Sequence, residues 1–200
     1  FDHFQHHLSL TQLKSLKLDM EKCREELKKN IYRDFRMFDP KTVISVDEMS
    51  ETLRNACEVM DALGKEERDE FVEWVASTQL QAYGAIFAPG GEKSGIEYLE
   101  RRFEWLKNQL LKYNKNYQRI FPRYWNVPGN ICKEFCDLTR NHLIEILKQS
   151  QQLNNLDMND LVKALEQCVS FEKELQRLYS QPSFNDDLEK IRISIKKPIG

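Results

Sequence analysis

Apolar residues recur every three or four positions along most of the chain, a period that predicts amphipathic helices. Breaks that contain glycine, proline or short polar runs separate the periodic segments. The predicted helices span residues 4–38, 46–63, 65–87, 94–121, 128–149 and 157–181. These lengths, together with the short breaks, predict an all-α fold, an elongated bundle of about six antiparallel helices.

The stretch from residue 94 to residue 139 organises this predicted bundle. Its first helix keeps one apolar seam for about seven turns. Consecutive seam residues are three or four positions apart: Ile96, Leu99, Phe103, Leu106, Leu110, Tyr113, Tyr117 and Ile120. Ser94 and Glu97 predict a capping box at the start of the helix, and Pro122 predicts its end. Such a long seam needs other helices to cover it, so the helix belongs inside a bundle.

The first predicted helix changes its apolar face part of the way along. Its first seam has the steps of a heptad repeat and consists of Leu13, Leu16, Met20, Cys23 and Leu27. The seam then shifts by one position and continues through Ile31, Phe35 and Phe38. Such a slip resembles a stutter, so we predict that the helix changes partner near Asn30.

The loop at residues 88–93 contains a proline and two glycines and is the best candidate for an internal boundary. We therefore expect a first part, residues 1–88, with the long helix and an antiparallel helix pair. A second set of rod helices, residues 94–180, continues from it. Residues 181–200 form a tail of uncertain structure, in which alternating apolar and polar residues after Ile191 also allow a short strand.

Charge and hydropathy exclude several classes of function. Charged residues make up 31% of the chain but nearly balance at a net charge of −2, whereas nucleic-acid-binding domains usually carry a strong basic excess. No apolar run of about 18 residues is present, so the sequence predicts no membrane-spanning segment. The chain starts with Phe1 rather than methionine and is expected to be a piece of a longer protein. Its cysteines lie inside helical patterns, which is typical of reduced thiols in a cytosolic protein.

The residue types that could support catalysis or metal binding are not arranged for it. Cys132, Cys136 and His142 lie on one predicted helix, but zinc needs further convergent ligands, and the chain has no CxxC pair. A thiol hydrolase using Cys136 is a poor alternative, because a helix interior does not present a nucleophile. Residues 100–102 carry charges typical of a solvated helix face. We predict no catalytic, cofactor-binding or metal-binding residues.

An aromatic corner separates the fourth and fifth predicted helices. Phe121, Tyr124 and Trp125 lie within five residues of one another. These side chains either pin the angle between the two helices or include an exposed anchor for a partner, since aromatic residues dominate interface hot spots. Both interpretations stay open, and the three residues form the possible interface of the chain.

Several segments resemble the family of vacuolar protein sorting-associated protein 53. The most specific are EYLERRFEWLKNQLLKYNKNYQRIFPRYW at 97–125 and EFCDLTRNHLIEIL at 134–147, which resemble the middle region of that family. The flanking segments fit in the same register: ETLRNACEVMDAL at 51–63, FVEWVASTQLQAYGAIF at 71–87 and SFEKELQRLY at 170–179. The combination of the FPRYW corner with EFCDLTR at a fixed distance carries the resemblance.

The resemblance implies a non-enzymatic, rod-like scaffold of the helical-rod tether class (CATCHR-like), without cofactors. The family belongs to the Golgi-associated retrograde protein complex, which captures endosome-derived vesicles at the trans-Golgi network before SNARE-mediated fusion. Expected partners are sister subunits, bound through helices near the N-terminus, together with SNAREs and small GTPases, at the cytosolic face of the trans-Golgi network and endosomes. Two alternatives stay open: a module that recognises a SNARE or small GTPase through residues 121–125, and a subunit of a related tether of the exocyst or conserved oligomeric Golgi type.

Overall fold

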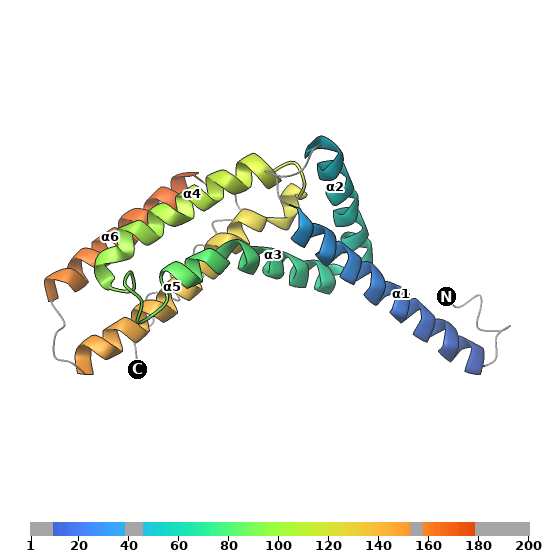
Figure 1. Ribbon diagram of the computed structural model, residues 1–200, viewed down its shortest axis with the longest axis horizontal. Helices are drawn as coiled ribbons and strands as arrows, with labels where there is room; N and C mark the ends of the chain where they lie inside the picture. The colour runs from blue at the N-terminus through green and yellow to red at the C-terminus, as the bar shows by residue number, and fades with distance from the viewer. Residues whose placement is uncertain (1–9, 39–45, 153–157, 179–200) are drawn as a thin grey trace. The chain divides into compact units, whose positions relative to one another are not determined.

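A computed structural model of the chain describes residues 10–38, 46–152 and 158–178 (Figure 1). All regular structure in these ranges is helical: α1 (Leu10–Met37), α2 (Val46–Leu63), α3 (Lys65–Ile86), α4 (Leu99–Tyr117), α5 (Val127–Gln152) and α6 (Met158–Leu178), with short 3-10 helices at Ile96–Tyr98 (η1) and Arg123–Trp125 (η2). The predicted all-α fold is therefore confirmed. The expected tail at 181–200 and the start of the last predicted helix at Asp157 lie outside the described residues.

The chain divides into two compact units between Phe71 and Val72, inside α3. The sequence placed its boundary at the 88–93 loop instead. That loop lies within the second unit, because one nitrogen of a buried arginine bridges its two ends. Arg102 Nη2 donates to the carbonyl oxygen of Phe87 at 3.2 Å and to that of Ser94 at 2.8 Å. As a division of the protein into domains, 1–88 and 94–180 stay predictions.

The first unit joins α1, α2 and the first turns of α3. Its core consists of Ile31, Phe35, Phe38, Leu53, Cys57, Met60 and Phe71. The rings of Tyr32 and Phe35 both meet Phe71 edge to face, with centroids 5.0 Å apart in each pair. Gly64 follows α2 with φ +134°, a backbone conformation that favours glycine.

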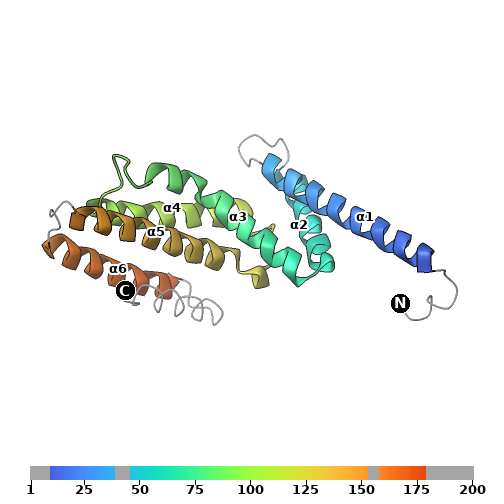
Figure 2. The ribbon, with the colours of Figure 1, turned by 90° about the horizontal axis from the view of Figure 1, so that it is seen from below.

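The second unit is an up-down bundle of α3 from Val72 onward, α4, α5 and α6 (Figures 1 and 2). Helices adjacent in the chain run antiparallel, and alternate helices run parallel. Phe103 of α4 stacks on Phe171 of α6 with centroids 4.0 Å apart, and one turn further along Lys107 pairs with Glu174 at 2.5 Å. Aromatic and aliphatic side chains from all four helices form the core, including Leu80, Tyr83, Leu106, Leu110, Ile131, Phe135, Phe171 and Leu175.

The predicted seam of the fourth helix is confirmed, but its start and end differ from the prediction. Leu99, Phe103, Leu106, Leu110, Tyr113 and Ile120 are buried. The segment begins with η1, whose N-cap is Gly95, and neither η1 nor α4 has a side-chain cap, so the capping box of Ser94 and Glu97 was wrong. The backbone of Ser94 is instead held by Arg102. At the other end α4 stops at Tyr117, ahead of Pro122.

Candidate functional site

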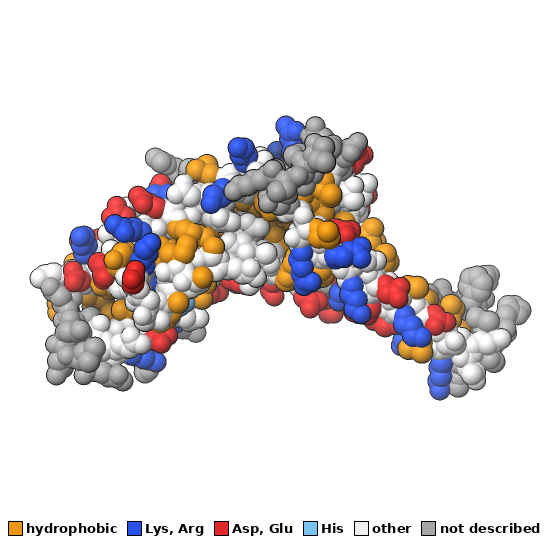
Figure 3. All heavy atoms as spheres, viewed as in Figure 1, with side chains coloured by type: hydrophobic (Ala, Val, Ile, Leu, Met, Phe, Trp, Pro, Cys, Tyr) orange, Lys and Arg blue, Asp and Glu red, His pale blue; other side chains and the backbone are white. Residues whose placement is uncertain are grey.

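The first half of α1 exposes an apolar seam. We call Leu13, Leu16, Met20, Cys23 and Leu27 the α1 seam. Leu16, Met20 and Leu27 are 47%, 50% and 46% exposed, Cys23 is exposed, and Leu13 is partly so. Figure 3 shows apolar side chains along α1 among charged ones. Because large apolar side chains in a row are seldom left in water, such a row marks a site of interaction.

The slip near Asn30 separates the exposed α1 seam from the apolar residues that are buried against other helices of this chain. Beyond the slip Ile31, Phe35 and Phe38 are buried. Before it, contacts to the other helices come from the adjacent helix face: Arg24 pairs with Glu67 of α3 and donates to the carbonyl of Leu63, the last residue of α2. The predicted change of partner therefore coincides with a change from an exposed to a buried seam.

The aromatic corner is divided between core and surface. Phe121 and Trp125 are 5% and 4% exposed, whereas Tyr124 is 70% exposed. The Phe121 ring stacks on Tyr113 and Tyr117, with centroids 6.2 and 6.3 Å away, and lies 6.0 Å from Trp125. Two of the three predicted interface residues are thus part of the packing between helices. An interface role stays a prediction, and within the corner only Tyr124 presents most of its side chain to a partner.

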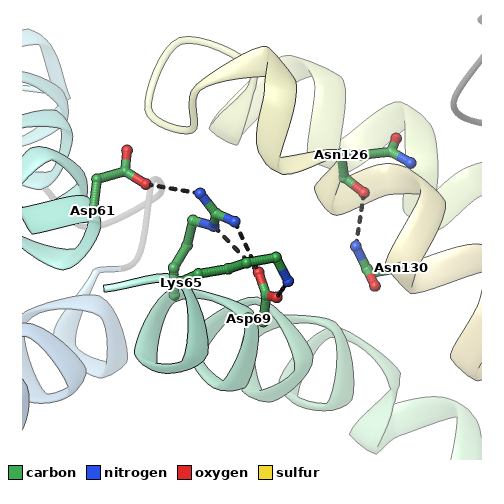
Figure 4. A network of polar contacts seen from close by, with 6 residues as sticks. Asp61, Lys65, Asp69, Asn126 and Asn130 are labelled. Atoms are coloured by element: carbon green, nitrogen blue, oxygen red, sulfur yellow. Dashed lines mark hydrogen bonds and ion pairs between the residues drawn. The ribbon is translucent and has the colours of Figure 1, made fainter. Parts of the chain in front are cut away.

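The turn from the corner into α5 depends on Asn126. Its backbone is left-handed, with φ 47° and ψ 43°, a conformation that asparagine tolerates better than most residues. The Asn126 carbonyl accepts from the backbone N–H and from the side-chain Nδ2 of Asn130, each at 3.1 Å (Figure 4). These bonds start α5 directly after the aromatic corner.

A second polar cluster lies at the turn between α2 and α3 (Figure 4). Arg68 Nη1 lies 3.4 Å from Asp61, and Asp69 pairs with both Arg68 and Lys65. These ion pairs are solvent-accessible, and pairs of this kind typically contribute about 0–1 kcal/mol. They support the turn between the two helices.

Arg102 is the feature that the sequence missed. Expected on a solvated face, it has 0% exposure. Its Nη1 donates to the Tyr83 hydroxyl at 3.0 Å and to His142 Nδ1 at 3.3 Å, and the Tyr83 hydroxyl lies 2.5 Å from that of Thr139. Its guanidinium carbon lies 4.9 Å from the centre of the Phe87 ring. Within the described ranges no carboxylate pairs with Arg102; its partners are two carbonyls, a hydroxyl, an imidazole and two aromatic rings.

The geometry defines the protonation of His142. Arginine can only donate, so His142 Nδ1 must accept and the ring is neutral. Burial lowers the pKa of His142, and the charge of Arg102 lowers it further. The sequence carried a weak signal for this network, because Arg102 lies only about 60° from the centre of the α4 seam at 100° per residue.

The cysteines of α5 are unsuited to nucleophilic attack. Burial raises the pKa of Cys136 to about 12 and raises the pKa of Cys132 well above its ordinary value. Both are therefore protonated thiols at neutral pH, whereas the reactive species is the thiolate. Among the residues in 10–38, 46–152 and 158–178, no three His, Cys, Asp or Glu side chains converge as they would around a metal ion.

None of the helices that the structure describes combines the length and the apolar character needed to cross a membrane.

Comparisons with known proteins identify the family. The family model "Vps53, N-terminal" matches residues 1–198. Vacuolar protein sorting-associated protein 53 A of Arabidopsis thaliana is 28% identical over 194 residues, which are 95% of this chain and 23% of that protein. The Caenorhabditis elegans homolog is 25% identical over 85% of this chain and 21% of its own length, and the Saccharomyces cerevisiae protein is 24% identical over 66% and 16%. No solved structure matches the chain.

The matched region corrects one detail of the expected resemblance. The residue motifs were assigned to the middle of the family, whereas the family model that matches describes its N-terminal part. The first 45 residues, which showed no matching motifs, also lie within the matched range. The chain spans less than a quarter of the length of these three relatives. It belongs to the Vps53 family and corresponds to the N-terminal region of that family.

Proposed function

We propose that this chain is part of a non-enzymatic subunit of a multisubunit vesicle-tethering complex, in which the α1 seam binds a helix of a sister subunit. The finer assignment is the Golgi-associated retrograde protein complex, which acts in transport from endosomes to the trans-Golgi network from the cytosolic face of those membranes. Family membership supports the assignment, since the relatives are named for vacuolar protein sorting. The observation that carries the proposal is the exposure of the α1 seam.

The spacing of the α1 seam fits a helical partner. Its steps of three, four, three and four residues are those of a heptad repeat, whose side chains insert as knobs into holes on a facing helix. From Leu13 to Leu27 the seam is about 21 Å long at 1.5 Å per residue. Nearly every residue from Thr11 to Cys23 is exposed, so partner helices can surround this half of α1.

Energetics support the same conclusion. Most of the stability of a helix in a protein comes from the packing of its apolar face rather than from helix propensity. The part of α1 that precedes the slip, residues 11–30, buries no side chain fully. Helices from sister subunits that cover the seam supply the missing apolar contacts. In this proposal the four-helix bundle of the second unit serves as the scaffold.

Cys23 gives a direct test, because it is a native thiol inside the α1 seam. We expect a maleimide to modify Cys23 readily in the isolated full-length protein and at least tenfold more slowly once the sister subunits are bound, since a covered thiol is shielded. The modification is followed by mass spectrometry of the Cys23 peptide. Cys132 is buried in the bundle and should stay unmodified in both states. Equal rates for Cys23 with and without the sister subunits would refute docking on this seam.

The exposure of Tyr124 favours a second candidate function, recognition of a SNARE or a small GTPase at the aromatic corner. We expect Tyr124→Ala to change stability by less than about 0.5 kcal/mol, because the side chain is exposed. We expect Trp125→Ala to cost about 3–5 kcal/mol, because its ring is buried. Thermal unfolding separates the two variants, and pull-down with SNAREs or GTP-loaded GTPases measures binding. If the corner recognises a partner, the Tyr124→Ala protein should fold but no longer bind that partner. Unchanged binding would contradict recognition, and the corner would then serve only in packing.

A further inference from the structure

α6 has an exposed apolar row on the side away from the bundle. We call Met158, Val162, Leu165 and Val169 the α6 stripe. Each is exposed by half or more, and their spacing of four, three and four residues places them along one helix face. The structure turns α6 so that Ala164, Phe171 and Leu175 are buried instead.

The two apolar faces of α6 are well separated. At 100° per residue the centre of the α6 stripe lies about 130° from the buried face. The buried face is held against α4 by the stacked rings of Phe171 and Phe103 and by the ion pair of Lys107 with Glu174. A helix with an apolar stripe buries it against another element, so α6 resembles a middle layer that the described residues cover on one side only.

The size of the α6 stripe indicates a covering segment from the same polypeptide. A standard interface between separate proteins uses about 20–30 residues on each side. Four side chains on one face of a helix fall far short of that number. A segment on the same chain binds in an intramolecular step, at an effective concentration that its linker sets, so it can dock through a small apolar face. The α1 seam differs, because nearly the whole circumference of its half-helix is open to partners.

The lengths of the relatives show that such a segment is available. The matched region makes up 23% of the Arabidopsis protein and 21% of the Caenorhabditis protein, and the family model describes the N-terminal part. Most of each relative therefore lies outside the matched region. We propose that an amphipathic helix from the part of this protein that follows residue 200 covers the α6 stripe. This proposal concerns a different helix from the α1 seam and does not depend on subunit docking there.

Site-specific cross-linking in the full-length protein tests the occupant. A photo-reactive amino acid replaces Leu165 on the α6 stripe, and the matched control places it at Lys163, an exposed position on the polar side of the same helix. We expect position 165 to cross-link to a peptide of the same chain that follows residue 200, at least fivefold more than position 163. A cross-link to a sister subunit, a cross-link to residues 179–200, or equal low yields at both positions would each overturn the proposal.

A second measurement keeps the test independent of cross-linking chemistry. The double substitution Leu165→Asp, Val169→Asp leaves the buried face of α6 unchanged. We expect it to raise deuterium uptake at least tenfold in the covering peptide, with unchanged uptake in α4. Unchanged uptake throughout the chain would contradict the proposal. Co-purification of sister subunits, measured on the same samples, reports separately on the α1 seam, so the two proposals can fail independently.

Discussion

We expect the double substitution Leu16→Asp, Met20→Asp to abolish co-purification of the sister subunits with the full-length protein. Both side chains belong to the α1 seam and are about half exposed in this chain. Full burial of such a side chain contributes about 1.5–3 kcal/mol, so burial of the exposed half of each contributes about 0.75–1.5 kcal/mol. Losing both weakens binding about 10- to 150-fold, at tenfold for every 1.4 kcal/mol. The aspartates add the cost of placing two charges in an apolar contact.

The same helix offers a matched control. Leu18 is 57% exposed and lies roughly on the opposite side of α1 from the seam at 100° per residue. Leu18→Asp introduces the same charge at a similar exposure, so assembly that proceeds with this variant separates an effect of the seam from a general effect of charge. Circular dichroism of each variant checks that α1 stays helical. Assembly that survives the double substitution, or that fails equally in the Leu18→Asp protein, would contradict the proposed docking site.

The second large effect is expected at Arg102. Arg102→Ala removes the donor for the carbonyls of Phe87 and Ser94 and for His142. Each buried acceptor left without a partner costs about 1–3 kcal/mol, so we expect the free energy of unfolding to fall by at least about 2 kcal/mol. Urea unfolding followed by tryptophan fluorescence measures the change, because Trp105 and Trp125 lie in the second unit with Arg102.

Arg101 provides the comparison for this prediction, because it precedes Arg102 on α4 and is exposed. Arg101→Ala should change the free energy of unfolding by less than about 0.5 kcal/mol, as is usual for surface substitutions. If Arg102→Ala and Arg101→Ala were equally stable, the hydrogen bonds of Arg102 would add no net stability beyond the cost of burying its charge. That result would contradict the role assigned to the network.

Local sequence patterns were sufficient to predict those features that depend on residues close together in the chain. The period of apolar residues predicted the bounds of α2 and α3 to within a residue and the seam of α4. The slip of the α1 seam near Asn30 predicted where that helix changes its surroundings, and Gly64 predicted the end of α2. Each of these features depends on residues close together in the sequence, so helix periodicity and backbone preference are enough to find them.

The start of α4 shows where local patterns fail. Ser94 and Glu97 have the spacing of a capping box, yet the chain forms η1 there and Arg102 takes the Ser94 carbonyl. The capping box does not form, and the buried guanidinium of Arg102, eight residues further along, holds the backbone of Ser94 instead. Tyr83 of α3 and His142 of α5 in turn position Arg102. The exposure of Leu165 is a second case, since the face that α6 turns toward α4 depends on Phe103 and Lys107 and not on the apolar period of α6 alone.

The sequence by itself determined that this protein is helical, where α2 and α3 begin and end, and to which family it belongs. The tertiary structure decided which apolar seams are used within the chain and which remain exposed, as on α1 and α6. It also decided that Arg102 is buried and that Tyr124 is the exposed residue of the aromatic corner. The physical reason is that a helical period shows that a face is apolar, whereas only the packing of distant segments shows what covers it.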